Sequence, residues 1–323
     1  MGPIPVPARS SVVLAVLFAI AACHSSATPA PPAASTAPTD SPPVVDASVA
    51  LLDAGSETPI ASIPVAIVEA GSTPADMLRV PGGTFTMGTD TGGEGDERPA
   101  HQVTLGAFWL DRTEVTQLAY DACVEAKVCT APDREILNIF GGLFKAPQKP
   151  VIGISWHSAR QYCEWRGKRL PREAEFERAV RGDDGRRYPW GNDAPRKELA
   201  VYEANYPEEV GSRPLGKGPY GHDDLAGNVW EWLEDEYDPL AYTRATASEG
   251  KPGTCDEILA AQNKLRAEGK QGFTGTNPIP TECEKNIRGG AYNYGGPGLR
   301  STNRIHHASR FKLRMTGVRC AKD

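Results

Sequence analysis

The stretch DDLAGNVWEW, Asp223 to Trp232, combines oxygen donors at the spacing of a metal-binding loop with two tryptophans at alternate positions. Asp224 and Glu231 each offer a carboxylate, and Gly227 lets the backbone turn so that its own carbonyl and that of Val229 point inward. A hard cation such as calcium prefers this ligand set. The spacing alone leaves two interpretations open: a calcium site, and a tight turn before a buried strand with the acids solvated.

Further motifs surround this loop in a fixed order. Together they resemble the formylglycine-generating enzyme family, also called sulfatase-modifying factors, from about residue 77 to residue 323. The resemblance implies an α+β fold that is irregular and loop-rich, related to the C-type lectin fold, with little regular secondary structure. It also favours the calcium site, held by the side chains of Asp224 and Glu231 and the carbonyls of Gly227 and Val229. The motifs are VPGGTFTMG (80–88), DRTEVTQLAY (111–120), the block from Pro150 to Gly182, YPWGND (188–193), GNVWEW (227–232), RGGAYNY (288–294), LRSTNR (299–304) and GVRCA (317–321).

The family's catalytic centre has no counterpart among these motifs. Active members use two cysteines just after the RGG block to bind copper(I) and activate oxygen, which oxidises a substrate cysteine to formylglycine. Here residues 288–304 read RGGAYNYGGPGLRSTNR, and no cysteine lies between Cys283 and Cys320. Two thiolates suit a soft, linear Cu(I) site in a way that tyrosine, glycine and leucine do not. We therefore expect no catalytic residues of the family type and no copper.

The first 23 residues resemble an export signal. Arg9 precedes the apolar run VVLAVLFAIAA, which is too short to span a bilayer permanently and ends at Cys23. Residues 20–23 match the pattern at which bacterial lipoproteins are cleaved and lipid-modified on the cysteine. We predict a signal peptide over residues 1–23 and an exported lipoprotein, anchored to a membrane of the cell envelope through acyl chains on Cys23. The alternative is an ordinary secretory signal with an incidental cysteine.

The rest of the chain divides into a tether and one domain. Residues 24–75 are dominated by Ala, Pro, Ser and Thr, so they bury too little apolar surface to fold, and we predict a disordered tether. Residues 76–323 form the sulfatase-modifying-factor-like domain. Within it, residues 236–285 are the least family-like and are an insertion, either a surface loop or a roof over the binding cleft. A net charge of −6 gives no basic surface for nucleic acid.

The cysteines point to a disulfide framework. Seven become six once Cys23 is lipidated, and an exported chain sits where disulfides persist. The alternatives are free buried thiols, or a thiol pair on the insertion that rebuilds an oxidoreductase site. The predicted pairs are Cys163–Cys320, which the resemblance implies, Cys123–Cys129, which would join a helix end to the following loop, and Cys255–Cys283, which remain.

Secondary-structure signals agree with few, short elements. Alternating residues predict strands within 77–87 and 102–110. Three helices are expected: one capped by Thr116, one capped by Ser155 and running through Trp165, and one opened by Pro171 and ending at Gly182. Arg172 stands where relatives usually have a threonine cap, so one capping hydrogen bond is expected to be missing. A further short helix is expected over 256–268.

Binding is the leading hypothesis for function. We expect the domain to bind a protein, peptide or glycan partner in the cell envelope. The alternatives are a formylglycine-generating-type oxidoreductase acting on protein cysteine with a rebuilt thiol or metal site, and a hydrolase, for which no nucleophile and base lie at an informative spacing. Arg288 and Arg319 are expected to anchor carboxylates. The candidate cleft residues are Tyr292, Asn293, Tyr294, Arg300, Asn303 and Arg304.

Overall fold

The computed structural model describes residues 76–138, 142, 144, 146–268 and 282–323. The described residues all belong to the second of two compact units, Ile67–Asp323. The predicted signal peptide, Cys23 and the tether lie outside the described residues. Among the described residues, no helix has the length and apolarity needed to cross a membrane.

The strands form three small sheets rather than one continuous one. The first has the antiparallel order β1-β4-β9, the second is the β2-β3 hairpin, and the third has the order β7-β6-β5-β8, with β8 parallel to β5. The predicted strands in 77–87 and 102–110 are confirmed. The strands are β1 (Met77–Val80), β2 (Gly83–Met87), β3 (His101–Leu105), β4 (Phe108–Asp111), β5 (Trp230–Glu236), β6 (Glu284–Arg288), β7 (Ile305–Ala308), β8 (Thr316–Gly317) and β9 (Ala321–Lys322).

The described helices are short and separated by long irregular segments, which confirms the α+β, loop-rich prediction. The insertion runs between β5 and β6 and carries one of them. The helices are α1 (Gln117–Glu125), α2 (Arg134–Asn138), α3 (Trp156–Trp165), α4 (Glu173–Arg181) and α5 (Cys255–Ala267). The 3-10 turns are η1 (Gly95–Glu97), η3 (Pro214–Gly216), η4 (Ala241–Thr243), η5 (Ala247–Glu249) and η6 (Gly296–Leu299).

Two helix caps form as the sequence predicts. The Thr116 hydroxyl accepts a hydrogen bond from the Ala119 N–H at 3.2 Å, and Ser155 caps α3 in the same way through the Ser158 N–H. The third helix begins two residues later than predicted, because Arg172 has extended backbone. An arginine side chain has no acceptor and cannot cap. The Glu175 carboxylate instead accepts the Arg172 N–H at 2.9 Å.

Two tryptophans of the opening motif anchor the core. Trp230 and Trp232 are both fully buried in the largest hydrophobic cluster, together with side chains of α1 and α3. The Trp232 indole donates to the Ile154 carbonyl at 3.2 Å, so burying this polar N–H leaves it satisfied. The sequence WEW is therefore part of a buried strand, in which Glu231 is the residue between the two tryptophans.

Three disulfides cross-link the domain, and their pairing is the predicted one. Cys123–Cys129 joins the end of α1 to the next loop, and Cys255–Cys283 ties the start of α5 to the residue before β6. Cys163–Cys320 links α3 to the residue before β9 over a sequence separation of 157. By loop-closure entropy, a bridge over so long a loop contributes about 3 to 5 kcal/mol.

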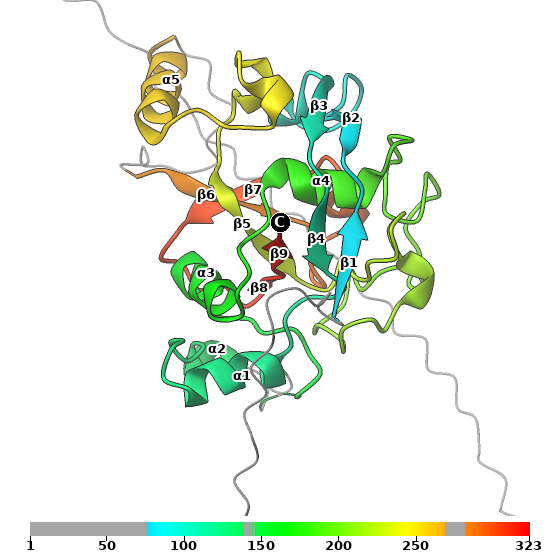
Figure 1. Ribbon diagram of the computed structural model, residues 1–323, viewed down its shortest axis with the longest axis vertical. Coiled ribbons are helices and arrows are strands. Elements are labelled where there is room, and N and C mark those ends of the chain that lie inside the picture. The colour runs from blue at the N-terminus through cyan, green and yellow to red at the C-terminus, as the bar shows by residue number, and fades with distance from the viewer. Residues whose placement is uncertain (1–75, 139–141, 143, 145, 269–281) are drawn as a thin grey trace, which may run out of the picture. The chain divides into compact units, whose positions relative to one another are not determined.

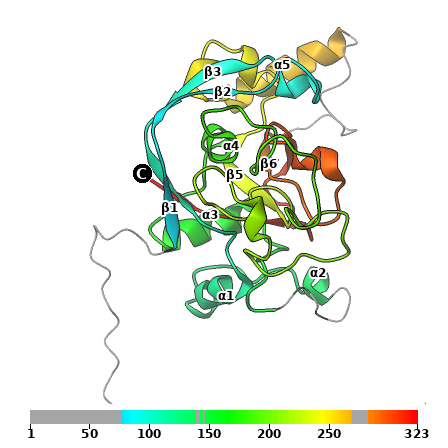
Figure 2. The same cartoon turned by 90° about the vertical axis from the view of Figure 1, so that its right-hand side faces the viewer.

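Helix α4 occupies the middle of the domain (Figure 1). It contacts β2 on one side and β5 and β6 on the other, whereas α3 packs on β5 and α1 packs on α3. Figure 2 shows the long β1–β4 ribbons passing along one side of α4, with α5 at one end of the domain and α1 at the other. This central helix therefore lies between the β2–β3 hairpin and the sheet that contains β5 and β6.

Candidate functional site

The predicted calcium loop has a strained, compact backbone. Asp224 and Asn228 both adopt positive φ, at 53° and 59°, which few non-glycine residues do. Gly227 has φ 93°, and a Cβ there would lie 2.6 Å from the Val201 carbonyl oxygen, so this position needs glycine. The turn leads through Val229 directly into β5, which carries Glu231.

Three buried carboxylates gather behind this loop around one arginine. We call Glu114, Asp224, Glu231 and Arg319 the Arg319 cluster. The Arg319 guanidinium donates to both oxygens of Glu231, at 2.6 and 2.8 Å, and one Asp224 oxygen accepts the Gly211 N–H at 2.5 Å. Both Glu114 oxygens are buried without a hydrogen-bond partner in the described part of the chain. Arg319 anchors a carboxylate, as predicted.

The Arg319 cluster holds more carboxyl groups than one arginine can pair, and burial makes their ionisation costly. Burial, and after it the Asp224 carboxylate, raises the pKa of Glu114 well above its usual value. Burial also raises the pKa of Asp224 and Glu231, although Arg319 opposes the shift at both. One guanidinium does not balance three carboxylates.

These residues fit a cation by charge, with donors of the hard type that calcium prefers. No group of three or more histidine, cysteine or carboxylate side chains in the described residues is arranged to hold a metal by itself. Backbone oxygens would therefore have to complete the shell. Glu114 was not predicted from the sequence. Its only signal is an acidic residue before the buried Val115 in the DRTEV motif.

A second buried cluster of carboxylates and arginines forms between two glutamates of α4 and arginines of other segments. We call Glu173, Glu177, Arg288 and Arg304 the Glu173 cluster. Arg288 donates to Glu173 at 3.0 Å and to Glu177 at 2.5 Å, and Arg304 donates to both oxygens of Glu173, at 2.6 and 2.8 Å. Burial pushes the pKa of Glu177 up, but the guanidinium groups of Arg288 and Arg181 outweigh it and hold the pKa below its usual value. The predicted anchoring role of Arg288 is confirmed.

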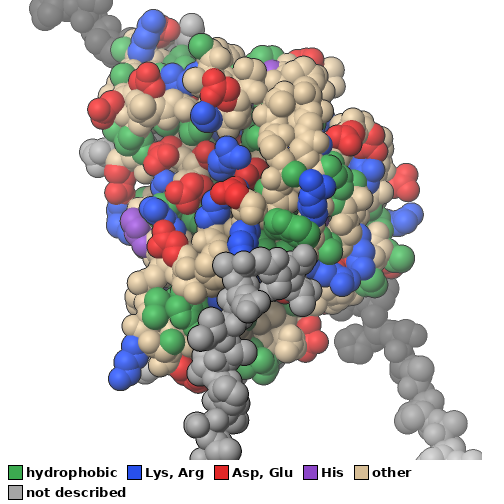
Figure 3. All heavy atoms as spheres, in the orientation of Figure 1, with side chains coloured by type: hydrophobic (Ala, Val, Ile, Leu, Met, Phe, Trp, Pro, Cys, Tyr) green, Lys and Arg blue, Asp and Glu red, His purple; other side chains and the backbone are tan. Residues whose placement is uncertain are grey.

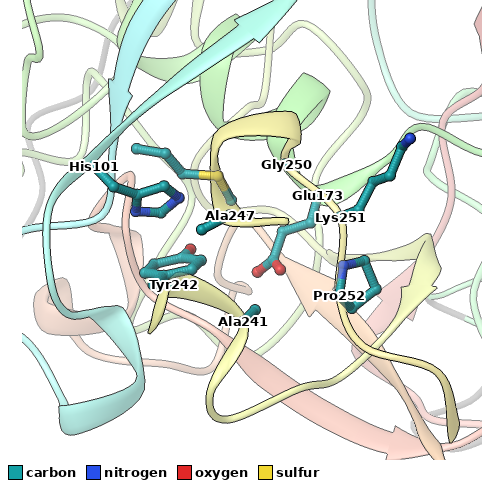
Figure 4. Close-up of a pocket in the computed structure, with 9 residues that line it drawn as sticks. His101, Glu173, Ala241, Tyr242, Ala247, Gly250, Lys251 and Pro252 are labelled. Atoms are coloured by element: carbon teal, nitrogen blue, oxygen red, sulfur yellow. The ribbon is translucent and has the colours of Figure 1, made fainter. Parts of the chain in front are cut away.

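The first half of the insertion covers the Glu173 cluster. The Asp238 carbonyl accepts from Arg304, and the Tyr242 ring lies 4.7 Å from the Arg304 guanidinium carbon. Figure 4 shows Tyr242 beside His101, with the Glu173 carboxylate approaching from α4. The cavity that these three residues line has a volume of about 10 Å³. That is room for about one water molecule and not for a ligand.

The structure does not bring the six predicted cleft residues to one opening. Tyr292 is buried in a hydrophobic cluster, and Arg304 is only 5 % exposed within the Glu173 cluster. Tyr294 packs edge-on against Trp230 at 5.2 Å. Asn293 is exposed and Asn303 half-buried. Of these six, Arg300 lines one of the three described cavities.

The cavity that contains Arg300, which we call the Arg300 pocket, has a volume of about 350 Å³. It lies where the loop after β2 meets the end of α4 and the segment after η6. None of the ten described residues that line it is acidic, and three are arginines. They are Thr89, Thr91, Gly92, Gly93, Arg181, Gly185, Arg187, Arg300, Ser301 and Thr302.

A larger cavity, of about 560 Å³, borders the insertion and includes Cys255 and Cys283. Its charges are mixed and partly paired, because Lys285 binds Glu236 at 2.7 Å. None of its lining residues comes from the segment 288–304. The cavity that the Cys255–Cys283 disulfide borders is therefore not lined by the RGG block or the residues that follow it.

The face of the molecule in Figure 3 shows no large patch of a single charge. Basic and acidic side chains are interspersed there over most elements. This agrees with the net charge of −6.

The site therefore belongs to a disulfide-stapled, loop-rich α+β domain with buried arginine–carboxylate clusters. Residues 65–323 match the Sulfatase-modifying factor enzyme 1-like domain, and the chain belongs to this family.

Both active and inactive relatives resemble the chain. It is 33 % identical to the formylglycine-generating enzyme of Streptomyces coelicolor over 235 residues, covering 55 % of this chain and 74 % of that protein. It is 32 % identical over 218 residues to inactive C-alpha-formylglycine-generating enzyme 2 of Bos taurus, covering 50 % and 71 %. PvdO from Pseudomonas aeruginosa has a similar structure, with a TM-score of 0.57 and 24 % identity over 76 % of this chain and 94 % of PvdO. Membership alone does not decide activity.

Copper(I) does not fit the residues present. All six cysteines outside residues 1–75 are paired in disulfides, so none is a thiolate. After the RGG block, Tyr294 packs on Trp230 and Leu299 is buried. Neither side chain is a ligand for a soft metal ion.

Proposed function

We propose that this domain does not carry out copper-dependent cysteine oxidation and acts as a binding module in the cell envelope. The observation that carries the proposal is the pairing of all six cysteines outside residues 1–75. A thiolate is the form that binds Cu(I), and a disulfide sulfur is not one. The relative named as an inactive enzyme supports the same conclusion.

Export and anchoring are part of this proposal. Disulfides persist in oxidising compartments, and three in one domain favour an exported protein. Acyl chains on Cys23 would hold the domain at a membrane, with residues 24–75 as the spacer. A Cys23→Ser variant should move the protein from the membrane fraction to the soluble fraction.

Calcium would serve the proposed binding module as a structural ion. Asp224 and Glu231 side chains and the carbonyls of Gly227 and Val229 would hold it, with Glu114 close by. Its charge would offset the surplus carboxylates of the Arg319 cluster. No chemical step is assigned to it.

The alternative oxidoreductase would use reduced Cys255 and Cys283. Peptide mapping by mass spectrometry under non-reducing conditions, together with a Cu(I) competition titration, separates the two functions. We expect the Cys255–Cys283 peptide to be disulfide-linked and no Cu(I) to be retained. Free thiols at both positions with stoichiometric Cu(I) binding would contradict the proposed function.

A further inference from the structure

The Arg300 pocket differs in chemistry from the other described cavities. Arg181, Arg187 and Arg300 line it, whereas the acidic partners of two of these arginines, Glu97 and Glu177, are fully buried. No ion pair of Arg187 occurs in the described part of the chain, and this side chain is exposed. Because Glu97 and Glu177 pair with Arg300 and Arg181, Arg187 is the lining charge that no carboxylate of the described residues neutralises, and it gives the cavity a net positive charge.

The wall of the pocket is held in place before any ligand arrives. Glu97 accepts hydrogen bonds from Arg300 and Thr302, both at 2.6 Å, and from the Glu94 N–H at 3.1 Å. Burial opposes ionisation of Glu97, but the bonds from Thr302 and Arg300 outweigh it and keep its pKa below the usual value. One carboxylate thus joins the loop after β2 to the segment after η6, and such preorganisation lowers the cost of binding.

The loop side of the pocket presents backbone donors. Gly92 and Gly93 have left-handed φ values of 69° and 68°. A Cβ at Gly93 would lie 2.2 Å from a Glu97 oxygen, so this residue has to be glycine. Neither N–H donates a hydrogen bond within the described residues. Successive free N–H groups near guanidinium groups are a common arrangement for binding an oxyanion.

The rest of the lining indicates what carries the anion. The other side chains are hydroxyls and glycines, and none of the described lining residues is aliphatic or aromatic. Most small-molecule pockets of 300 to 1,000 Å³ are largely apolar. A cavity of about 350 Å³ without apolar side chains suits a ligand that is hydrophilic on every side. This favours a sugar over a peptide, because peptide side chains and Cα groups would need apolar contacts.

We propose that the Arg300 pocket binds an anionic sugar through its oxyanion, a carboxylate, sulfate or phosphate. The inference rests on the proposed binding role and specifies its ligand class. Arg187 and the Gly92 and Gly93 N–H groups contact the oxyanion, and the Thr91 and Ser301 side of the pocket faces the sugar hydroxyls. Arg300 and Arg181 complete the wall of the pocket, each held by its pairing with a buried glutamate.

Isothermal titration calorimetry on the full chain tests the proposal with glucuronate, glucose 6-phosphate and glucose 6-sulfate. We expect at least one of these sugars to bind at one site per chain, with an affinity that falls as salt rises. Neutral glucose should bind far more weakly. Inorganic phosphate alone should bind more weakly than glucose 6-phosphate, because the sugar adds contacts.

Arg187→Gln should weaken binding about tenfold, the loss expected for one charge-assisted hydrogen bond. The side chain is exposed, so the fold should not change. Thr91→Glu, which places a negative charge in the pocket, should weaken binding further. Arg79→Gln removes another exposed arginine, on β1 and outside the pocket, and should leave the affinity unchanged.

The proposal is wrong if none of the three charged sugars binds, if glucose binds equally well, or if Arg187→Gln has no effect. Phosphate binding as tightly as glucose 6-phosphate would refute the sugar assignment. The sugar assignment would also be refuted if an acidic peptide bound instead of the sugars and Arg187→Gln weakened that binding. None of these results would affect the peptide mapping or the Cu(I) titration. Those two measurements test the proposed function separately.

Discussion

The two buried clusters contain the same kinds of side chain and differ in their balance of charge. In the Glu173 cluster two carboxylates meet two arginines, and all four carboxylate oxygens accept hydrogen bonds. In the Arg319 cluster three carboxylates share one arginine, and both Glu114 oxygens are left without a partner among the described residues. The charges of the first cluster are therefore balanced by its own side chains, whereas the second holds more carboxyl groups than its arginine can pair, and either a proton on Glu114 or a bound cation would offset the difference.

The largest effect is expected from breaking the balanced cluster. Arg288→Ala leaves Glu173 and Glu177 buried with fewer donors, and should lower the free energy of unfolding by about 3 to 5 kcal/mol. Urea denaturation followed by tryptophan fluorescence measures it. Arg187→Gln, at an exposed arginine, is the matched control and should change stability by less than about 0.5 kcal/mol. Equal values for both variants would contradict the structural role of the cluster.

The second largest effect is expected from adding calcium, whose charge would offset the unpaired carboxyl groups of the Arg319 cluster. Calcium added to the chelator-treated protein at about 100 times its Kd should stabilise the fold by about 2.7 kcal/mol, if it binds only the folded state. For a domain of this size that corresponds to a melting-temperature rise of roughly 5 to 10 °C. Differential scanning calorimetry gives the shift.

Two variants test whether calcium raises the melting temperature by binding at the loop that contains Asp224. Asp224→Ala should abolish most of the rise, whereas a substitution at a distant exposed acid, Glu249→Ala, should not. Magnesium should act more weakly, because it prefers a tighter octahedral shell of waters. An unchanged melting temperature on adding calcium to the wild-type chain would show that the negative surplus is tolerated without a metal.

The last prediction concerns Asp235, a buried carboxyl at the edge of the Glu173 cluster, and its effect is the smallest of the three when taken per pH unit. Burial, with a smaller contribution from the Glu173 carboxylate, raises its pKa to about 7. Because the folded-state pKa exceeds the unfolded value, its contribution to stability is full below pH 4 or so and is lost as the pH rises through about 7. The free energy of unfolding should fall by up to about 1.4 kcal/mol per pH unit in this window.

Asp235→Asn should remove this slope while keeping an oxygen that accepts the Glu173 N–H. Urea titrations at half-unit pH steps compare the two proteins. If both show the same slope between pH 4 and 7, another carboxyl is responsible and the environment assigned to Asp235 is wrong.

The sequence predicts local features of this domain well. The caps at Thr116 and Ser155, the strands near 77–87 and the buried tryptophans all follow from nearest neighbours and from alternation along the chain. Motif order supplied the family, and with it the Cys163–Cys320 pair. These features depend on short stretches of sequence, or on a resemblance spread over the whole domain.

The cavity chemistry could not be predicted, because it depends on distant segments. Arg187 lies in a loop after α4, Gly92 in a loop after β2 and Arg300 after η6, and only the folded chain brings them to one cavity. Arg304 was expected in an open cleft, but the insertion packs against it through Asp238. Glu114 joins Asp224 from more than a hundred residues away. Local patterns do not report such contacts.

The proposed absence of cysteine oxidation is tested most directly by mass spectrometry of a peptide carrying a sulfatase-type cysteine motif. The purified chain would be incubated with this peptide, oxygen and Cu(I), beside the Streptomyces coelicolor formylglycine-generating enzyme as the positive control. We predict that the peptide keeps its thiol with this protein and gains an aldehyde with the control. Stoichiometric conversion of the cysteine to formylglycine by this chain would contradict the account.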